Sequence, residues 1–136
     1  MATHGAWRLP APLRDEIIRH AQQHPTKEVC GIIAGTPTLA TKVFKMRNVE
    51  DSPIGYALDP REQLQVMQAM RAAGWDLLAV YHSHTATPAE LSPVDITHAY
   101  PDMAYMVVSL QRDPPVLNVY RIGAGGMPEP VNIQMS

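Results

Sequence analysis

The sequence is poor in cysteine, since Cys30 is the only one among 136 residues. A lone thiol cannot form an intramolecular disulfide, which is the device that stabilises many small secreted domains. This absence favours a reducing compartment, and we expect the protein to be cytoplasmic.

Long hydrophobic runs and an excess of charge of one sign are also missing. No segment approaches the roughly 18 consecutive apolar residues of a membrane span, and the N-terminus lacks the basic and apolar regions of a signal peptide. With 11 basic and 13 acidic residues, the formal net charge is -2. Such a balance provides no electrostatic footprint for polyanions. We therefore expect no nucleic-acid partner and no membrane association.

Charged residues make up only 18% of the chain, whereas apolar residues make up 46%. This is enough apolar content to offset the chain entropy lost on folding, and it argues against intrinsic disorder. The 13 prolines are scattered instead of forming a linker. A length of 136 residues suits one core, so we expect a single domain over residues 1–136.

The spacing of apolar residues predicts two longer helices. Residues 12–24 have the pattern of an amphipathic helix. A second helix begins at Asp59, which is followed by Pro60 at the first helical position, and it ends at Gly74. Its residues expected to face the core are Leu64, Met67, Ala69 and Met70.

Short apolar and β-branched runs predict strands between these helices and after them. The expected strands are residues 28–35, 39–48, 77–82, 103–110, 116–122 and 131–133. Because strands and helices do not alternate strictly, we expect an α+β fold, a mixed β-sheet flanked by helices on one or both faces. The glycine-rich segment 123–126 precedes no helix that could hold phosphate, so we interpret it as a turn.

His82 ends the continuous apolar run of the predicted strand 77–82, and His84 follows two positions later. Side chains at positions i and i+2 of a strand project to the same face, so both imidazoles can bind one metal ion while Ser83 points away. Asp95 lies in the first turn of a short helix predicted at residues 92–98, after a loop long enough to fold back. Two imidazoles and a carboxylate leave a fourth position open, as in catalytic zinc sites. We therefore predict Zn²⁺ held by His82, His84 and Asp95.

Hydrolysis at such a site also needs a proton acceptor and an oxyanion donor. Glu28, at the start of the first predicted strand, is the candidate acid/base. Ser92, at the start of the 92–98 helix, is the candidate donor to the oxyanion that develops on an attacked carbonyl. A simpler interpretation also exists, because Ser92 and Asp95 have the spacing of a capping box and Glu28 alone suits a solvated charge. The conjunction of these residues favours the metal site.

Other polar or reactive residues are assigned to structure. Cys30 lies in an apolar strand and is expected to pack in the core instead of acting as a nucleophile. His98 falls three residues after Asp95, where it either contacts the site or lies on the surface, and we favour the surface. The histidines without spaced partners, which we expect to be exposed, are His4, His20 and His24.

The order of these residues resembles the signature of the JAMM (MPN+) zinc metallopeptidases: Glu28, then the segment His82-Ser83-His84, then Ser92 and Asp95. The similarity extends to residues 28–31, 56–60 and 100–102, and it covers about residues 8–133. It implies a cytidine-deaminase-like JAMM/MPN fold, with zinc on His82, His84 and Asp95, Glu28 as acid/base and Ser92 stabilising the oxyanion. Thr85 stands where the family often has proline, so we expect an altered loop with zinc retained.

Among members of this family, the chain looks most similar to small bacterial ones. It lacks the long insertions of eukaryotic deubiquitinases and resembles Mec-type peptidases more than RadC-type relatives. The resemblance implies a zinc-dependent metallopeptidase that hydrolyses the amide bond after the C-terminal Gly-Gly of a ubiquitin-like sulfur carrier protein, releasing an amino acid such as cysteine. Two alternatives stay open, an isopeptidase that removes ubiquitin-like modifiers from proteins and a noncatalytic MPN interaction module. The sequence also leaves open a homo-oligomer.

Overall fold

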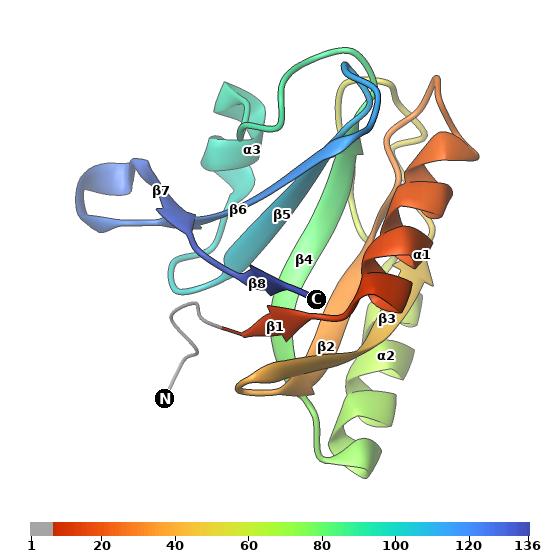
Figure 1. Ribbon diagram of the computed structural model, residues 1–136, viewed down its shortest axis with the longest axis vertical. Helices are drawn as coiled ribbons and strands as arrows, with labels where there is room; N and C mark the ends of the chain where they lie inside the picture. The colour runs from red at the N-terminus through yellow and green to blue at the C-terminus, as the bar shows by residue number, and fades with distance from the viewer. Residues whose placement is uncertain (1–6) are drawn as a thin grey trace.

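The computed structural model describes residues 7–136 and contains one eight-stranded mixed sheet (Figure 1). Its strands are β1 (Arg8–Leu9), β2 (Cys30–Thr36), β3 (Leu39–Met46), β4 (Asp76–His84), β5 (Ala104–Ser109), β6 (Val116–Ile122), β7 (Pro128–Val131) and β8 (Gln134–Met135). The helices are α1 (Ala11–Gln22), α2 (Pro60–Ala73) and α3 (Pro93–His98), with a 3-10 turn, η1 (Ala124–Gly126). The α+β prediction is confirmed.

The sheet curls until its two ends approach each other. The strand order is β7-β6-β5-β4-β2-β3-β1-β8, so β7 and β8 lie at opposite ends. Only residues 132 and 133 join these two strands in the chain, and three Cα–Cα steps of about 3.8 Å cannot bridge a flat sheet of this width. The curl wraps the sheet around a core whose residues include Trp7, Leu9 and Ile17.

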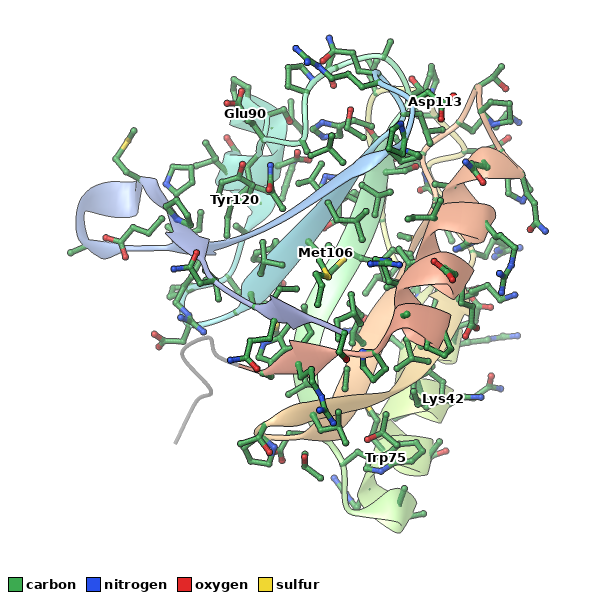
Figure 2. The ribbon with its side chains drawn as sticks, viewed as in Figure 1. Lys42, Trp75, Glu90, Met106, Asp113 and Tyr120 are labelled. Carbon is green, nitrogen blue, oxygen red and sulfur yellow. The ribbon has the colours of Figure 1, made fainter. Side chains whose placement is uncertain are left out.

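Helices cover both faces of this sheet, each over its own hydrophobic cluster. In the first cluster, Ile17 and Ala21 of α1 pack with strand residues that include Met106, which Figure 2 shows between the sheet and α1. In the second, Val66 and Met70 of α2 pack against the opposite face. Alternation along the strands divides their side chains between the two clusters, which is why the middle of β2 and residues 77–81 of β4 are apolar at consecutive positions instead of every second one.

The predicted core face of α2 is wrong at three positions. Leu64 is 60% exposed, Met67 is 48% exposed and Ala69 is exposed, whereas Val66 and Met70 are buried. Within residues 7–136 no second layer packs over the outer side of α2, so only a narrow stripe of the helix is covered. Apolar periodicity alone does not distinguish which of two apolar stripes meets the sheet.

The C-terminal strands also differ from the predicted ones. The segment predicted at 131–133 is divided between β7, which ends at Val131, and β8, which begins at Gln134. Pro128 and Pro130 hide the strand signal of β7, because proline is compatible with a sheet only where no ladder donor is needed, as at an edge. The glycine-rich segment forms the turn that was predicted, with positive φ at Gly125 and Gly126. No helix in the described part of the chain is long and apolar enough to cross a membrane.

Candidate metal centre

The two predicted histidine ligands lie at the end of β4, in the middle of the sheet. β4 pairs antiparallel with β2 and parallel with β5, so both sides of this strand are held by ladder hydrogen bonds. His82 is fully buried and His84 is 4% exposed, and their Nε2 atoms lie 3.3 Å apart. Ser83 between them accepts a hydrogen bond from the backbone N–H of Val29. The i, i+2 spacing therefore brings the two imidazoles together on one face.

Asp95 reaches the histidines because α3 begins with a capping box. The Oγ of Ser92 accepts a hydrogen bond from the Asp95 backbone N–H, and the Ser92 N–H donates to Asp95 Oδ2 at 2.9 Å. The same Oδ2 lies 3.1 Å from Nε2 of both His82 and His84. One local motif thus aims a carboxylate oxygen at the imidazole pair.

The electrostatics of this cluster favour a positive charge between its members. Burial alone would raise the pKa of Asp95, but its contacts with His82 and His84 hold that pKa well below its ordinary value. Burial also opposes protonation of His84, yet Asp95 and the Pro88 carbonyl raise its pKa. The pKa of His82, the more deeply buried ring, is lowered by burial. A metal ion can supply the positive charge by replacing a shared proton, since metal binding requires deprotonated ligands.

The orientation of His84 is set by the loop that follows it. Its Nδ1 lies 2.8 Å from the carbonyl oxygen of Pro88, so Nδ1 carries the proton and donates it. The loop is anchored at Ala89, whose carbonyl accepts hydrogen bonds from the Asn118 side chain and from the Tyr120 hydroxyl at 2.7 Å. Figure 2 shows Tyr120 on β6, on the side of the sheet where α3 lies. Sequence reasoning missed this anchor because β6 and the loop are about 30 residues apart.

His82 is held by stacking instead. Its Nδ1 is buried without a hydrogen-bond partner among the described residues. The ring of Tyr56 stacks on its imidazole, with centroids 4.4 Å apart and planes inclined by 17°. Tyr56 lies in the segment 49–58 between β3 and α2, which sequence reasoning read as a loop. Its one signal was the aromatic residue within the family-like stretch 56–60.

Glu28 lies two residues before the start of β2 and is only 6% exposed. Because Cys30 pairs with His82, and the Ser83 N–H donates to the Val29 carbonyl, Glu28 falls opposite His84 on the neighbouring strand. Burial raises the pKa of Glu28 to about 7, with the charge of His84 lowering it and that of Asp95 raising it. Its Oε1 has no hydrogen-bond partner within residues 7–136. The alternative of a solvated charge is therefore wrong.

Ser92 has the capping role that the simpler interpretation assigned to it. Its hydroxyl oxygen accepts from the Asp95 N–H, which leaves the hydroxyl hydrogen available for another acceptor. Capping and donation to a substrate oxygen are thus compatible in one side chain.

A cavity of about 380 Å³ opens beside this cluster. Tyr56 lines the cavity together with Asp95 and His98, which lie one turn apart on the same side of α3. Most of the remaining lining is apolar and comes from β2, β4 and the segment 49–58. His98 itself is exposed, as predicted. The cavity provides space for a substrate beside Asp95 and Tyr56.

The remaining histidines and the cysteine are placed away from this chemistry. The prediction for His20 is wrong, because this residue is half-buried and its Nδ1 lies 2.8 Å from the Tyr81 hydroxyl, where α1 packs on the sheet. Burial lowers the pKa of His20 to about 4, with smaller contributions from His24 and Lys45. His24 is exposed as predicted, and His4 lies outside the described residues. Cys30 is buried, and burial raises its pKa to about 12, which suits an inert core thiol.

A curled mixed sheet with helices on both faces, and two imidazoles and a carboxylate converging at the end of its central strand, together define an α+β domain with a three-ligand metal cluster. The family described as prokaryotic homologs of the JAB domain matches residues 10–123. The chain belongs to this JAB (JAMM/MPN) family and is a peptidase of that class.

Relatives of known function share most of the chain. It is 40% identical over 131 residues to the CysO-cysteine peptidase of Mycobacterium tuberculosis, covering 92% of this chain and 89% of that one. It is 34% identical over 109 residues to the desampylase of Haloferax volcanii, covering 74% and 78% of the two chains.

Solved structures show the same fold. A protein from Desulfitobacterium hafniense matches with a TM-score of 0.87 and 32% identity, over 95% of this chain and 92% of that chain. A JAB1/MPN domain protein from Archaeoglobus fulgidus matches with a TM-score of 0.62 and 12% identity, over 96% of each chain. The JAMM/MPN fold expected from the resemblance is confirmed.

Proposed function

We propose that this peptidase is zinc-dependent and hydrolyses the amide bond after the C-terminal Gly-Gly of a ubiquitin-like sulfur carrier protein, releasing an amino acid such as cysteine. The observation that carries the proposal is the convergence of His82, His84 and Asp95 beside the buried Glu28. The relative named CysO-cysteine peptidase, 40% identical across 92% of this chain, supports the choice of substrate.

The donor set fits zinc. Two imidazole nitrogens and one carboxylate oxygen are the ligands of many catalytic zinc sites. Ligand atoms bound at about 2.0–2.1 Å in a tetrahedron lie roughly 3.3 Å from one another, and the three atoms here are 3.1, 3.1 and 3.3 Å apart. When bound, Zn²⁺ supplies a Lewis acid that polarises a carbonyl and lowers the pKa of water to about 7.

Glu28 is the proton carrier in this proposal. Its carboxylate accepts a proton from the water molecule whose oxygen forms the new bond to the carbonyl carbon. The C–N bond then breaks, and the carboxyl group returns the proton to the departing amine nitrogen. Burial raises the pKa of Glu28 to about 7 in the metal-free protein, and the charge of a bound Zn²⁺ would lower it from there toward the carboxylate form that accepts the proton.

Ser92 is the proposed oxyanion donor. Its hydroxyl hydrogen is not used by the capping box, so it is available to the oxygen that becomes negative as the carbonyl is attacked. Such a donor is worth about 3–4 kcal/mol in the transition state. The rigid start of α3 keeps this hydroxyl next to Asp95, at the edge of the ligand cluster.

The proposal that the substrate ends in Gly-Gly is supported by the residues that lie over the ligand cluster. Tyr56 lies over His82, and the cavity beside Asp95 is bounded by the segment 49–58, so a chain entering here passes close to the protein. Glycine residues permit such an approach because they have no side chains. A second candidate activity is cleavage of a modifier from a protein lysine, which the relative named desampylase favours.

The test compares the two activities in one protein. Zinc is measured by elemental analysis, and mass spectrometry follows products from a carrier–cysteine adduct and from a carrier–lysine protein conjugate. We expect about one zinc per chain, release of cysteine by the native protein, and no turnover by Glu28→Gln. Glu129→Gln, at an exposed position of β7, is the matched control and should retain full activity. Zinc without cleavage of either adduct contradicts the proposal, and cleavage of the lysine conjugate alone favours the isopeptidase.

A further inference from the structure

Asn48 immediately precedes the segment 49–58, and its side-chain amide uses its full hydrogen-bonding capacity. The amide nitrogen donates to two carbonyl oxygens and the amide oxygen accepts from two backbone N–H groups, at 2.9–3.0 Å. An amide has two donor hydrogens and two acceptor lone pairs, so all four are used. The partners are the carbonyls of Glu28 and Gly55 and the N–H groups of Glu50 and Ala57.

Two of these bonds bracket Tyr56. Asn48 donates to the carbonyl of Gly55 and accepts from the N–H of Ala57, so the residues on either side of Tyr56 are attached to one amide. The Val49 N–H also donates to the Ala57 carbonyl, which closes the base of the loop. The backbone at Tyr56 is therefore fixed, and the ring that stacks on His82 is fixed with it.

A third bond connects the same amide to Glu28. Asn48 donates to the Glu28 carbonyl, and the Glu28 N–H donates to the carbonyl of Ser52 within the segment 49–58. The backbone N–H of Glu28 is thus held by Ser52 in this segment, and its carbonyl is held by Asn48, the residue just before the segment. Glu28 has not yet entered the β2 ladder, which begins at Cys30, so these bonds take the place of the sheet in positioning it.

We propose that Asn48 is a positioning residue that sets Glu28 and the Tyr56–His82 stack relative to each other. The inference rests on the proposed function for the role of Glu28 in proton transfer, while the link to Tyr56 is independent of it. An amide is required, because a carboxylate of the same shape keeps both acceptor bonds and loses both donor bonds, those to Glu28 and to Gly55.

Asn48→Asp in the zinc-loaded full chain tests this role, with Asn132→Asp as the matched control at an exposed position between β7 and β8. We expect kcat on the carrier–cysteine adduct to fall about 10- to 100-fold, with KM changed less than about threefold and zinc still stoichiometric. The control should behave as the native protein. NMR of the His82 ring protons gives a readout independent of activity, because loss of the Tyr56 ring above them moves their signals toward those of Tyr56→Ala.

Native kcat together with native His82 signals in Asn48→Asp would overturn the proposal. Loss of zinc and a general fall in melting temperature, with the His82 signals of the folded fraction unchanged, would also overturn it, since Asn48 would then serve the fold alone. Asn48→Ala, which loses all four bonds, must change the His82 signals at least as much as Asn48→Asp. If the native protein cleaves no adduct, the proposed function fails, but the His82 signals still decide whether Asn48 holds Tyr56 in place.

Discussion

Tyr56 and His82 lie face to face, with ring centroids 4.4 Å apart, although 26 positions separate them in the chain. The stack takes the place of a hydrogen bond at His82 Nδ1, which has no partner among the described residues. His84, in contrast, is oriented by the carbonyl of Pro88. The two imidazoles of the cluster are therefore supported in two different ways.

Replacement of Tyr56 by alanine is expected to weaken zinc binding about tenfold, because groups that orient a metal ligand typically contribute 10- to 100-fold to affinity. Competition with a chromogenic chelator measures this affinity. Ile54→Ala is the control, since Ile54 lies in the same segment but is 81% exposed. Equal affinities for the two variants would show that the stack does not support His82.

Asp95→Asn should abolish stoichiometric zinc binding. The substitution keeps the shape of the side chain but removes the negative charge that faces both histidines at 3.1 Å. Zinc is measured after dialysis, with Asp15→Asn on the exposed side of α1 as the control. Chelation of the native protein should likewise lower its melting temperature, because an ion at about 1,000 times its Kd stabilises the folded state by about 4 kcal/mol. An Asp95→Asn protein that retains one zinc per chain contradicts the assignment.

Glu28 should make the metal-free protein less stable as the pH rises. Burial raises the pKa of Glu28 from 4.5 to about 7, so the folded state binds this proton more tightly than the unfolded state does. The stabilisation from protonation is complete below about pH 4.5 and is lost as the pH rises through about 7. Glu28→Gln does not titrate. Its free energy of unfolding should therefore exceed that of the native protein by on the order of 2 kcal/mol more at about pH 8 than at about pH 5.

Urea titrations of both chelated proteins at the two pH values measure this difference. The difference of differences cancels the contributions of titrating groups remote from residue 28, so it reports the Glu28 proton together with its coupling to His84 and Asp95. A free-energy gap that does not change with pH would mean that the folded and unfolded states bind the Glu28 proton equally well.

Ser92→Ala should separate the capping role of Ser92 from its proposed chemical role. Loss of the cap costs about 1 kcal/mol of stability, whereas loss of an oxyanion donor lowers kcat about 100-fold or more. Ser92→Thr keeps the hydroxyl and should retain most of the activity. Asp59→Ala removes the N-cap of α2 and an ion pair with Arg47, at a residue outside the ligand cluster and the cavity lining, and should cost stability without a comparable loss of kcat. Equal kcat losses in Ser92→Ala and Asp59→Ala would leave Ser92 with capping alone.

The two methionines of α2 provide a matched pair for the core. Met70 is 7% exposed and packs in the second cluster, whereas Met67, one turn earlier, is 48% exposed. Met70→Ala should lower the free energy of unfolding by about 2–5 kcal/mol, and Met67→Ala by less than about 0.5 kcal/mol. Denaturant unfolding of both variants measures these free energies. Similar losses of stability in the two variants would mean that the outer face of α2 is covered in solution.

Some of the fold was predictable because its causes lie within a few residues. Helix α2 begins after Asp59 with Pro60 at its first position and ends at Gly74, whose φ of 73° is the left-handed conformation expected there. The short β1 and the proline-containing β7 were missed, because a two-residue strand has no periodicity and proline reads as a breaker. The exposed Leu64 was also missed, since the covered side of a helix depends on what lies next to it.

The sequence by itself determined how the three proposed metal ligands are arranged. Strand alternation places His82 and His84 on one face, and a capping box turns Asp95 inward, because both effects depend on neighbours two or three positions away. Only the tertiary structure decided that Glu28 lies opposite His84, that Tyr56 covers His82 and that Asn48 connects them. These relationships come from strand register and loop closure between distant segments, and the free energy that selects them belongs to the packing of the whole sheet.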